Sequence, residues 1–269
     1  MSFPPKVSVI FATYNEHPKH LMIALESIVN QTIKPYELII TVEPNELNVQ
    51  LLKNFKSRLK TRLIFNKSMR GLTSSLNIAC KSAKGDFIAR MDSDDIWHED
   101  KLEKQLSLLT KNNYDVVGCD INLINTKGEL VGDRVYSIRT AKSNFLFQNG
   151  LCHPSIIIKT SILRAFGFYN SDFKSAEDLE LWLRLLSKKV KIGYYPEKLM
   201  KYRIRDNQIR NIINWKFNLK ARVKYNFKIY NPLAALISLL VPIGALIMVE
   251  LKAEVLSQKI YNRLLIKKE

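Results

Sequence analysis

Three aspartates stand close together at the end of an apolar segment. Asp92, Asp94 and Asp95 follow residues 86–91 (DFIARM), whose composition predicts a buried strand. Carboxylates at this spacing repel one another, and such oxygen ligands suit a hard cation, Mg²⁺ or Mn²⁺, that also takes oxygens from a substrate phosphate. An aspartate can instead cap the following helix, but a cap needs one side chain and not three. The cluster therefore favours a metal site, with Asp92 and Asp94 on the same side of an extended segment.

A second acidic pair, Glu177 and Asp178, opens a predicted helix over residues 177–188. Ser175 and Asp178 have the spacing of a capping box, and acidic side chains favour a helix N-terminus. A carboxylate that projects from a helix start into a cleft can also act as a general base. Taken alone, the pair is more typical of a cap, and the residues leave both interpretations open.

Two further residues are candidates for substrate or metal contacts. Cys152 and His153 are adjacent, so they do not present their side chains to each other, and we reject a thiol nucleophile. His153 is either a satisfied histidine or an accessory group near a metal. Arg70 precedes Gly71 at the start of a predicted helix, where it either faces a phosphate or is an ordinary surface arginine.

Short apolar strands alternate with amphipathic helices through the first hundred residues, which predicts βαβ units and a mostly parallel α/β sheet flanked by helices. The strands are expected at 7–12, 37–42, 63–65 and 86–91, and the helices at 18–30, 45–57 and 71–82. Further along, we expect helices at 99–112 and 177–188, strands at 115–121 and 155–159, and a turn-rich segment at 128–150.

Polar residues follow three of these strands. They are residues 13–16 (TYNE), Glu43 and residues 92–95 (DSDD). Ligands of open parallel sheets bind beyond the carboxyl ends of the strands. The sequence therefore predicts that these segments converge on one crevice.

Several classes of protein are excluded by missing motifs. There is no GxGxxG after the first strand and no GxxxxGK[ST], so neither a dinucleotide-binding enzyme nor a P-loop NTPase is indicated. The three cysteines form no CxxC pair, which argues against a disulfide scaffold or zinc ribbon. With no signal-peptide pattern at the N-terminus, a reducing cytoplasm is expected.

The net charge of +17 is concentrated in the last third of the chain, because residues 187–269 hold 18 basic and 5 acidic side chains. A basic helix with interleaved aromatics, expected at 207–228, leads into the apolar segment 233–249. This order favours a helix that lies in or re-enters an anionic membrane surface over one that spans it. A helix that packs on the catalytic domain, or one that dimerises, is the alternative.

The ordered motifs VSVIFATYNE, ELIITVEPN, MRGLTSSLN, ARMDSDDIW, CHPSIIIK and AEDLELWLR, between Lys6 and Arg205, resemble glycosyltransferase family 2 with its GT-A fold. The resemblance is to bacterial O-antigen, capsule and exopolysaccharide glycosyltransferases. It implies a GT-A catalytic domain at 1–206, with a nucleotide-sugar half at about 1–97 and an acceptor half at about 98–206. Residues 207–269 then form a basic and apolar, membrane-associating helical region.

The resemblance also implies roles for individual residues. Asp178 would be the catalytic base, with Glu177 beside it, and Asp94 would bind the metal. The nucleotide-sugar would be bound by Thr13, Tyr14, Glu16, Glu43, Arg70, Asp92 and Ser93. His153 and Arg205 would be accessory groups, although Arg205 stands where the family often has histidine.

The implied reaction is an inverting transfer, dependent on Mn²⁺ or Mg²⁺, of one sugar from a UDP-sugar to a polyprenyl-pyrophosphate-linked saccharide. The absence of QxxRW favours single-sugar transfer over a processive synthase. The expected location is the cytoplasmic face of the inner or plasma membrane, with peripheral or monotopic attachment and no nucleic-acid partner. The alternatives are a basic nucleic-acid-binding protein, which does not explain the aspartate cluster, and a sugar-phosphate nucleotidyltransferase, whose glycine-rich loop is missing.

Overall fold

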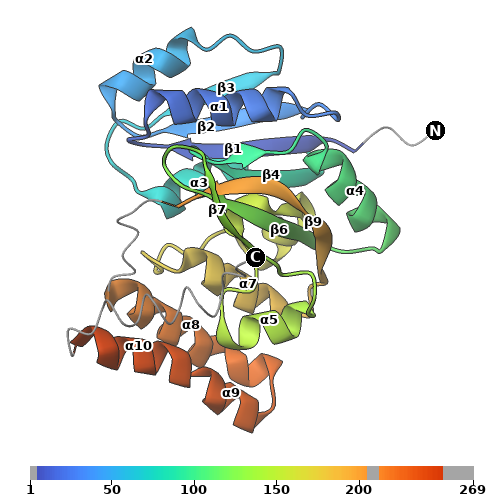
Figure 1. Ribbon diagram of the computed structural model, residues 1–269, viewed down its shortest axis with the longest axis vertical. Coiled ribbons are helices and arrows are strands. Elements are labelled where there is room, and N and C mark those ends of the chain that lie inside the picture. The colour runs from blue at the N-terminus through green and yellow to red at the C-terminus, as the bar shows by residue number, and fades with distance from the viewer. Residues whose placement is uncertain (1–4, 205–211, 251–269) are drawn as a thin grey trace.

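A computed structural model describes residues 5–204 and 212–250, and these form a layered α/β fold (Figure 1). The strands are β1 Val7–Thr13, β2 Glu37–Val42, β3 Thr61–Phe65, β4 Phe87–Asp92, β5 Ile96–Trp97, β6 Val116–Ile124, β7 Leu130–Arg134, β8 Ile157–Lys159 and β9 Ile192–Arg203. The helices are α1 Pro18–Val29, α2 Glu46–Asn54, α3 Leu72–Ser82, α4 Lys101–Lys111, α5 Ala141–Phe147, α6 Thr160–Phe166, α7 Glu177–Ser187, α8 Ile212–Ile229, α9 Pro232–Ser238 and α10 Leu240–Glu250, with a 3₁₀ turn at His153–Ser155.

Within the described ranges the strands form one sheet in the order β3-β2-β1-β4-β8-β6-β9-β5, with β7 paired to β6. The first four strands are parallel, as the alternation of strands and helices predicts. The remainder is mixed rather than mostly parallel, because β8 runs antiparallel to both β4 and β6, while β9 is parallel to β6. The α/β class with flanking helices is confirmed, and the parallel character is limited to part of the sheet.

Strand β9 is the largest element missing from the sequence-based expectation. Its sequence contains Pro196 and several charged residues, which are unusual in a central strand. Pairing with β6 shifts register between Cys119–Tyr195 and Asp120–Lys198, so Pro196 falls in a bulge. The strand then continues to Arg203 and lies between β6 and β5 in the sheet.

Both faces of the sheet are covered because successive strand residues point to opposite sides. In β1, Val9 and Phe11 pack in the core beneath α1 and α4, whereas Ile10 packs in the core formed with α3 and α7. The second core also receives Ala221 and Tyr225 of α8. Helix α8 is therefore part of the hydrophobic core of this fold.

The expected apolar segment 233–249 is divided into two helices, α9 and α10, at Leu239. Among the described residues, the stretch from Pro232 to Val249 is apolar enough and long enough to cross a membrane, with a mean hydropathy of 2.4. It nevertheless packs on α8, where Asn226 Nδ2 donates to Ser238 Oγ at 2.7 Å. Figure 1 shows α8, α9 and α10 at the end of the molecule opposite α2.

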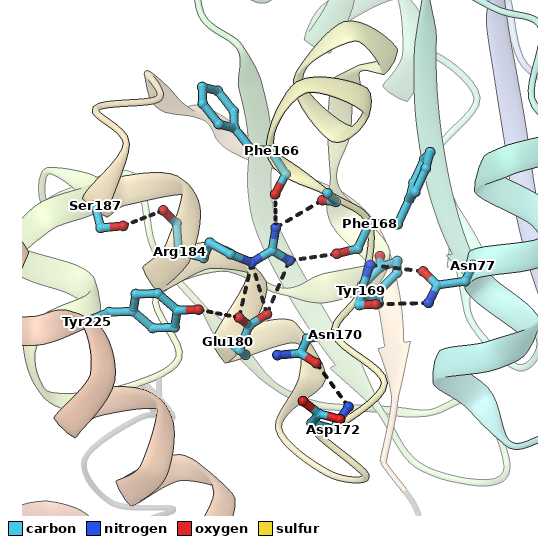
Figure 2. A network of polar contacts seen from close by, with 11 residues as sticks. Asn77, Phe166, Phe168, Tyr169, Asn170, Asp172, Glu180, Arg184, Ser187 and Tyr225 are labelled. Carbon is cyan, nitrogen blue, oxygen red and sulfur yellow. Dashed lines mark hydrogen bonds and ion pairs between the residues drawn. The ribbon is translucent and has the colours of Figure 1, made fainter.

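A buried polar network fixes α7 against its neighbours (Figure 2). Glu180 of α7 is fully buried and receives the Arg184 guanidinium and the Tyr225 hydroxyl, the latter at 2.6 Å. Arg184 also donates to the carbonyl oxygens of Phe166, the last residue of α6, and of Gly167 and Phe168 in the loop that follows. One carboxylate thus links α7, α8 and this loop.

Replacing Arg184 with methionine should strongly destabilise the fold, because Glu180 would remain as a buried charge without its cation. Breaking a buried ion pair in this way costs about 3–5 kcal/mol. Denaturant unfolding of the two proteins measures the difference. The control is Lys188→Met, an exposed lysine at the end of α7, which should change the free energy of unfolding little. Equal losses in the two variants would contradict the role of the network.

Candidate active site

The carboxyl ends of three strands lie side by side, as the sequence predicts. Ala12 is in register with Asp92 across the β1–β4 pair, and Thr13 is in register with Val42 across the β1–β2 pair. The Glu43 amide continues this ladder by donating to the Thr13 carbonyl oxygen at 3.0 Å. The polar segments that follow β1, β2 and β4 therefore meet at one edge of the sheet.

After β1 the chain turns around the Glu16 carboxylate. Glu16 Oε2 accepts from Thr13 Oγ1 at 2.5 Å and from the Tyr14 amide at 2.7 Å. Asn48 of α2 donates to the Tyr14 carbonyl oxygen at 3.0 Å and secures the turn from the other side. Thr13 is buried, while the Tyr14 side chain is 47% exposed and available to a flat ligand.

The Glu43 carboxylate is held by groups of the chain itself. It is buried and accepts from Ser75 Oγ at 2.5 Å, Asn66 Nδ2 at 3.0 Å and the Arg70 amide at 2.8 Å. Glu43 thus ties the loop before α3 to the end of β2. The Arg70 side chain is exposed, and Gly71 follows with a φ of +77°, a conformation that favours glycine.

The aspartate cluster differs from the expectation in two respects. Asp92 ends β4, but Ser93 and Asp94 form a turn closed by the Asp95 amide, so the segment is not extended. No aspartate of the cluster caps the next helix, since α4 begins at Lys101.

The repulsion within the cluster is relieved by the protein itself. Asp92 forms an ion pair with the buried Arg90 guanidinium. Burial raises the pKa of Asp95 well above its ordinary value, with the charges of Asp92 and Asp94 adding to the rise. A cation of the chain itself, Arg90, thus stands beside the cluster, and a metal ion there stays a prediction.

Strand β9 anchors the same turn. The Arg203 amide donates to Asp95 Oδ1 at 2.8 Å, and its Nε donates to the Asp94 carbonyl oxygen at 2.9 Å. Arg203 is buried and also reaches the Asn125 carbonyl oxygen at 2.9 Å. The predicted accessory residue Arg205 lies outside the described residues.

A pocket of about 280 Å³ opens beside the cluster and brings together four of the predicted site residues. These are Asp92, His153, Glu177 and Asp178. Other lining residues are Leu72, Arg90, Arg134, Val135, Tyr136, Gln148, Asn149, Leu151, Cys152, Pro154 and Tyr202. The other predicted residues that the structure describes do not line this pocket. Four of them end or follow the neighbouring strands β1 and β2 (Thr13, Tyr14, Glu16 and Glu43), Arg70 lies in the loop before α3, and Ser93 and Asp94 form the turn after β4.

Helix α7 brings Glu177 and Asp178 to this pocket without the expected capping box. The N-cap is Ala176, which has a φ of 54°, and the Ser175 hydroxyl donates to Asn214 of α8 at 3.0 Å. Asp178 Oδ2 accepts from Asn149 Nδ2 at 2.5 Å, and Oδ1 accepts from the Leu179 amide at 2.7 Å. The predicted capping box is therefore absent, although Asp178 accepts one amide of the first turn, and Glu177 and Asp178 both line the pocket.

Burial shifts the pKa of Glu177 and that of His153 in the direction that favours the uncharged side chain. Burial raises the pKa of Glu177 to about 7, and the adjacent Asp178 charge adds to the rise. Burial lowers the pKa of His153 well below its ordinary value, assisted by the Arg90 charge. His153 Nε2 contacts the Tyr169 hydroxyl at 2.5 Å, and its ring meets Trp182 edge-on. His153 is therefore a satisfied, uncharged histidine in the pocket wall.

No group of three His, Cys, Asp or Glu side chains in the described part of the chain is arranged to hold a metal by itself. Magnesium sites in phosphate-transfer enzymes commonly use one or two carboxylates and complete their shell with substrate oxygens and water. Asp94, which is 9% exposed, and Asp92 fit that partial set.

Arg90 and Asn149 are site residues that sequence reasoning missed. Arg90 had a detectable signal, a charged residue inside the apolar segment DFIARM. Its Nε and Nη1 atoms are buried and have no hydrogen-bond partner among the described residues. Asn149 had no detectable sequence signal, because it lies in a turn-rich segment with no regular pattern.

Replacing Glu177 with glutamine should make stability less dependent on pH. The folded protein retains the Glu177 proton up to about pH 7, whereas a free carboxyl releases it near 4.5. The wild type therefore loses stability as pH rises through this window, since its unfolded state binds fewer protons. The melting temperature of the variant should increase relative to wild type between pH 4.5 and pH 8. Glu46→Gln, at an exposed site on α2, is the control, and parallel curves for Glu177→Gln and wild type would contradict the assignment.

Comparison with known proteins identifies the family of this chain. The sequence profile of Glycosyl transferase family 2 matches residues 8–165. An uncharacterized glycosyltransferase of Methanocaldococcus jannaschii is 32% identical over 234 residues, covering 83% of this chain and 80% of that protein. The O-antigen biosynthesis glycosyltransferase WbnJ of Escherichia coli is 34% identical over 204 residues, 74% of this chain and 79% of WbnJ. The E. coli protein WfgD, named UDP-Glc:alpha-D-GlcNAc-diphosphoundecaprenol beta-1,3-glucosyltransferase, is 32% identical over 183 residues, 67% of this chain and 69% of WfgD.

Solved structures agree on the fold. S. aureus TarS 1–349 in complex with UDP-GlcNAc superimposes with a TM-score of 0.66 at 18% identity, over 81% of this chain and 66% of that one. This chain spans 39% of the longer TarS chain. The family profile covers more than half of the chain, and the relatives match most of their own length. The protein is therefore a glycosyltransferase with the GT-A fold, and it belongs to glycosyl transferase family 2.

Proposed function

We propose that this enzyme transfers one sugar from a UDP-sugar to a saccharide carried on a polyprenyl pyrophosphate, with inversion at the anomeric carbon. The observation that carries the proposal is the pocket that is lined by both Asp92 and Asp178. The names of the relatives WbnJ and WfgD support surface-polysaccharide assembly and a lipid-linked acceptor. The TarS complex with UDP-GlcNAc is compatible with a UDP-sugar donor.

In this proposal Asp178 is the catalytic base. Its carboxylate removes the proton of an acceptor hydroxyl, and that oxygen attacks the anomeric carbon while the bond from this carbon to the diphosphate oxygen breaks. UDP leaves with the bonding electron pair, and Asp178 then releases the proton to solvent. A single displacement from an α-linked donor yields a β-glycoside.

The donor is proposed to lie along the ends of β1, β2 and β4. The exposed Tyr14 ring is suited to stack on a base, and the turn around Glu16 and Thr13 supports it. Asp94, together with Asp92, would hold Mg²⁺ or Mn²⁺, which when bound neutralises charge on the diphosphate. Release of Asp92 from Arg90 would leave the guanidinium free for donor oxygens.

The family membership favours this function over the two alternatives, a nucleic-acid-binding protein and a nucleotidyltransferase. The basic C-terminal stretch also offers less free charge than its composition suggests. Arg222 is fully buried, and Lys198 pairs with Asp133. A continuous electrostatic footprint for nucleic acid needs free cations at the surface, whereas Arg222 is buried and the exposed Lys198 is paired.

Attachment to an anionic membrane is proposed to involve the outer face of α8–α10. Lysines recur every fourth residue on α8 and are exposed, and a run of exposed apolar side chains follows on α9 and α10. The lysines are Lys216, Lys220, Lys224 and Lys228, and the apolar residues are Leu233, Leu236, Ile237, Leu240, Val241, Ile243 and Ile247. A polybasic stripe beside apolar side chains suits the headgroup boundary of a bilayer. Peripheral or monotopic attachment at the cytoplasmic face would bring the pocket near its lipid-linked acceptor.

Replacing Asp178 with asparagine should lower sugar transfer about 10²–10⁴-fold, the range that a positioned general base contributes. UDP binding, measured by calorimetry, should remain within about twofold because Asp178 is assigned to the acceptor side. The control is Asp172→Asn, which changes an exposed aspartate in the loop before α7. Turnover of Asp178→Asn at the wild-type level would show that another group is the base.

Replacing Leu240 with glutamate should weaken binding to vesicles that contain phosphatidylglycerol, because a charge would enter the exposed apolar face. Cosedimentation measures the bound fraction, and wild-type binding should fall with added salt and with neutral vesicles. Leu130→Glu, at a leucine of β7 with the same 64% exposure, is the matched control. Equal binding of both variants and wild type would overturn the membrane assignment.

A further inference from the structure

We infer that Asn149 positions the Asp178 carboxylate, and that Arg222 of α8 holds Asn149 in place through the end of α5. The inference rests on the proposed function, because it concerns the group assigned there as the base. It assigns a part of the catalytic apparatus to the C-terminal helices.

The hydrogen bond between Asn149 and Asp178 fixes the orientation of the Asp178 carboxylate. Asn149 Nδ2 donates to Asp178 Oδ2 at 2.5 Å, while the Leu179 amide donates to Oδ1 at 2.7 Å. One donor on each oxygen prevents rotation of the carboxylate about its last bond. Both residues line the pocket, so the remaining lone pairs are turned to the space where an acceptor hydroxyl would lie.

The orientation of the Asn149 amide follows from charge. A carboxylate can only accept hydrogen bonds, so the NH₂ group of Asn149, and not its carbonyl oxygen, must face Asp178. The Asn149 Oδ1 atom is then buried and without a hydrogen-bond partner among the described residues. This unpaired acceptor lies in the pocket wall, as expected of a residue retained for a site rather than for its own stability.

The backbone on both sides of Asn149 is tied down. Arg222 Nη2 donates to the Gln148 carbonyl oxygen at 3.2 Å, and the Tyr194 hydroxyl donates to the Gly150 carbonyl oxygen at 2.8 Å. A Cβ on Gly150 would lie 2.8 Å from the Asn144 Cβ and 2.9 Å from the Phe145 amide nitrogen. The chain is therefore pressed against α5 at this point, which only glycine permits.

Arg222 binds the carbonyl groups at the C-terminal end of α5. It is fully buried, and its Nη1 donates to the carbonyl oxygens of Phe145 at 2.9 Å and Leu146 at 2.6 Å. Its Nε donates to Asn218 Oδ1 at 2.8 Å. The carbonyls at a helix C-terminus carry partial negative charge, and a cation there satisfies them. Arg222 thus caps α5 from another helix and fixes the residue that follows it.

The test uses the full-length enzyme with a soluble acceptor analogue, so that membrane binding does not enter the readout. Asn149→Ala should lower kcat about 10²-fold, the cost of a misplaced catalytic group, while the donor KM and UDP affinity stay within about twofold. Arg222→Lys should retain more of kcat than Arg222→Ala, because lysine can still donate to some of the α5 carbonyls. Lys142→Ala, at an exposed lysine of α5, is the control.

The outcomes separate this inference from the function on which it rests. If Asp178→Asn is inactive but Asn149→Ala keeps wild-type kcat, the positioning role is overturned and the base assignment stands. If Asn149→Ala lowers kcat, UDP affinity and melting temperature together, Asn149 is merely structural and the inference fails. If Asp178→Asn keeps turnover, the proposed function itself fails. A fall in kcat alone, with Arg222→Lys above Arg222→Ala, supports the inference.

Discussion

Buried arginines neutralise the polar groups that the fold gathers at and behind the carboxyl edge of its sheet, and the site depends on them. Arg90 pairs with Asp92 at the end of β4, and Arg203 holds the following turn through Asp95 and the Asp94 carbonyl. Within α7, Arg184 compensates Glu180. Buried charges without such partners would cost several kcal/mol each. Asp92 and Glu180 are therefore stabilised by cations of their own elements, and the Asp94–Asp95 turn is held by Arg203 from β9.

These arginines also explain why distant segments form one catalytic unit. Arg203 comes from β9 and secures a turn more than a hundred residues earlier in the chain. Arg222 comes from α8 and secures the end of α5, beside the residue that contacts Asp178. The α8 helix has two faces with different roles, one packed on α7 and one carrying exposed lysines. The C-terminal region is thus proposed both to support the catalytic base and to form the surface that meets lipid.

The parts of the fold that depend on local pattern could be predicted from the sequence. Apolar β-branched runs alternating with amphipathic helices were enough to place β1, β2 and β4 and the convergence of their ends. Strand β9 could not be predicted because its bulge at Pro196 interrupts any periodicity, and its pairing with β6 is long-range. The division of the apolar segment at Leu239 could not be predicted because uniform hydrophobicity does not reveal where a helix ends.

Of the predicted site residues, the pocket brings together Asp92, His153, Glu177 and Asp178, and the predicted capping box at Ser175 is absent. Local spacing cannot tell that Arg90 pairs with Asp92, that burial raises the pKa of Asp95, or that Asn149 reaches Asp178. Those facts depend on which side chains meet after folding.

The most direct test of the catalytic account is the anomeric configuration of the product formed from an α-linked UDP-sugar. A single displacement assisted by Asp178 predicts a β-glycoside, identified by the proton coupling constant of the new anomeric centre in an NMR spectrum. An α-glycoside would contradict the account, because retention requires either a second displacement or attack from the face that UDP leaves.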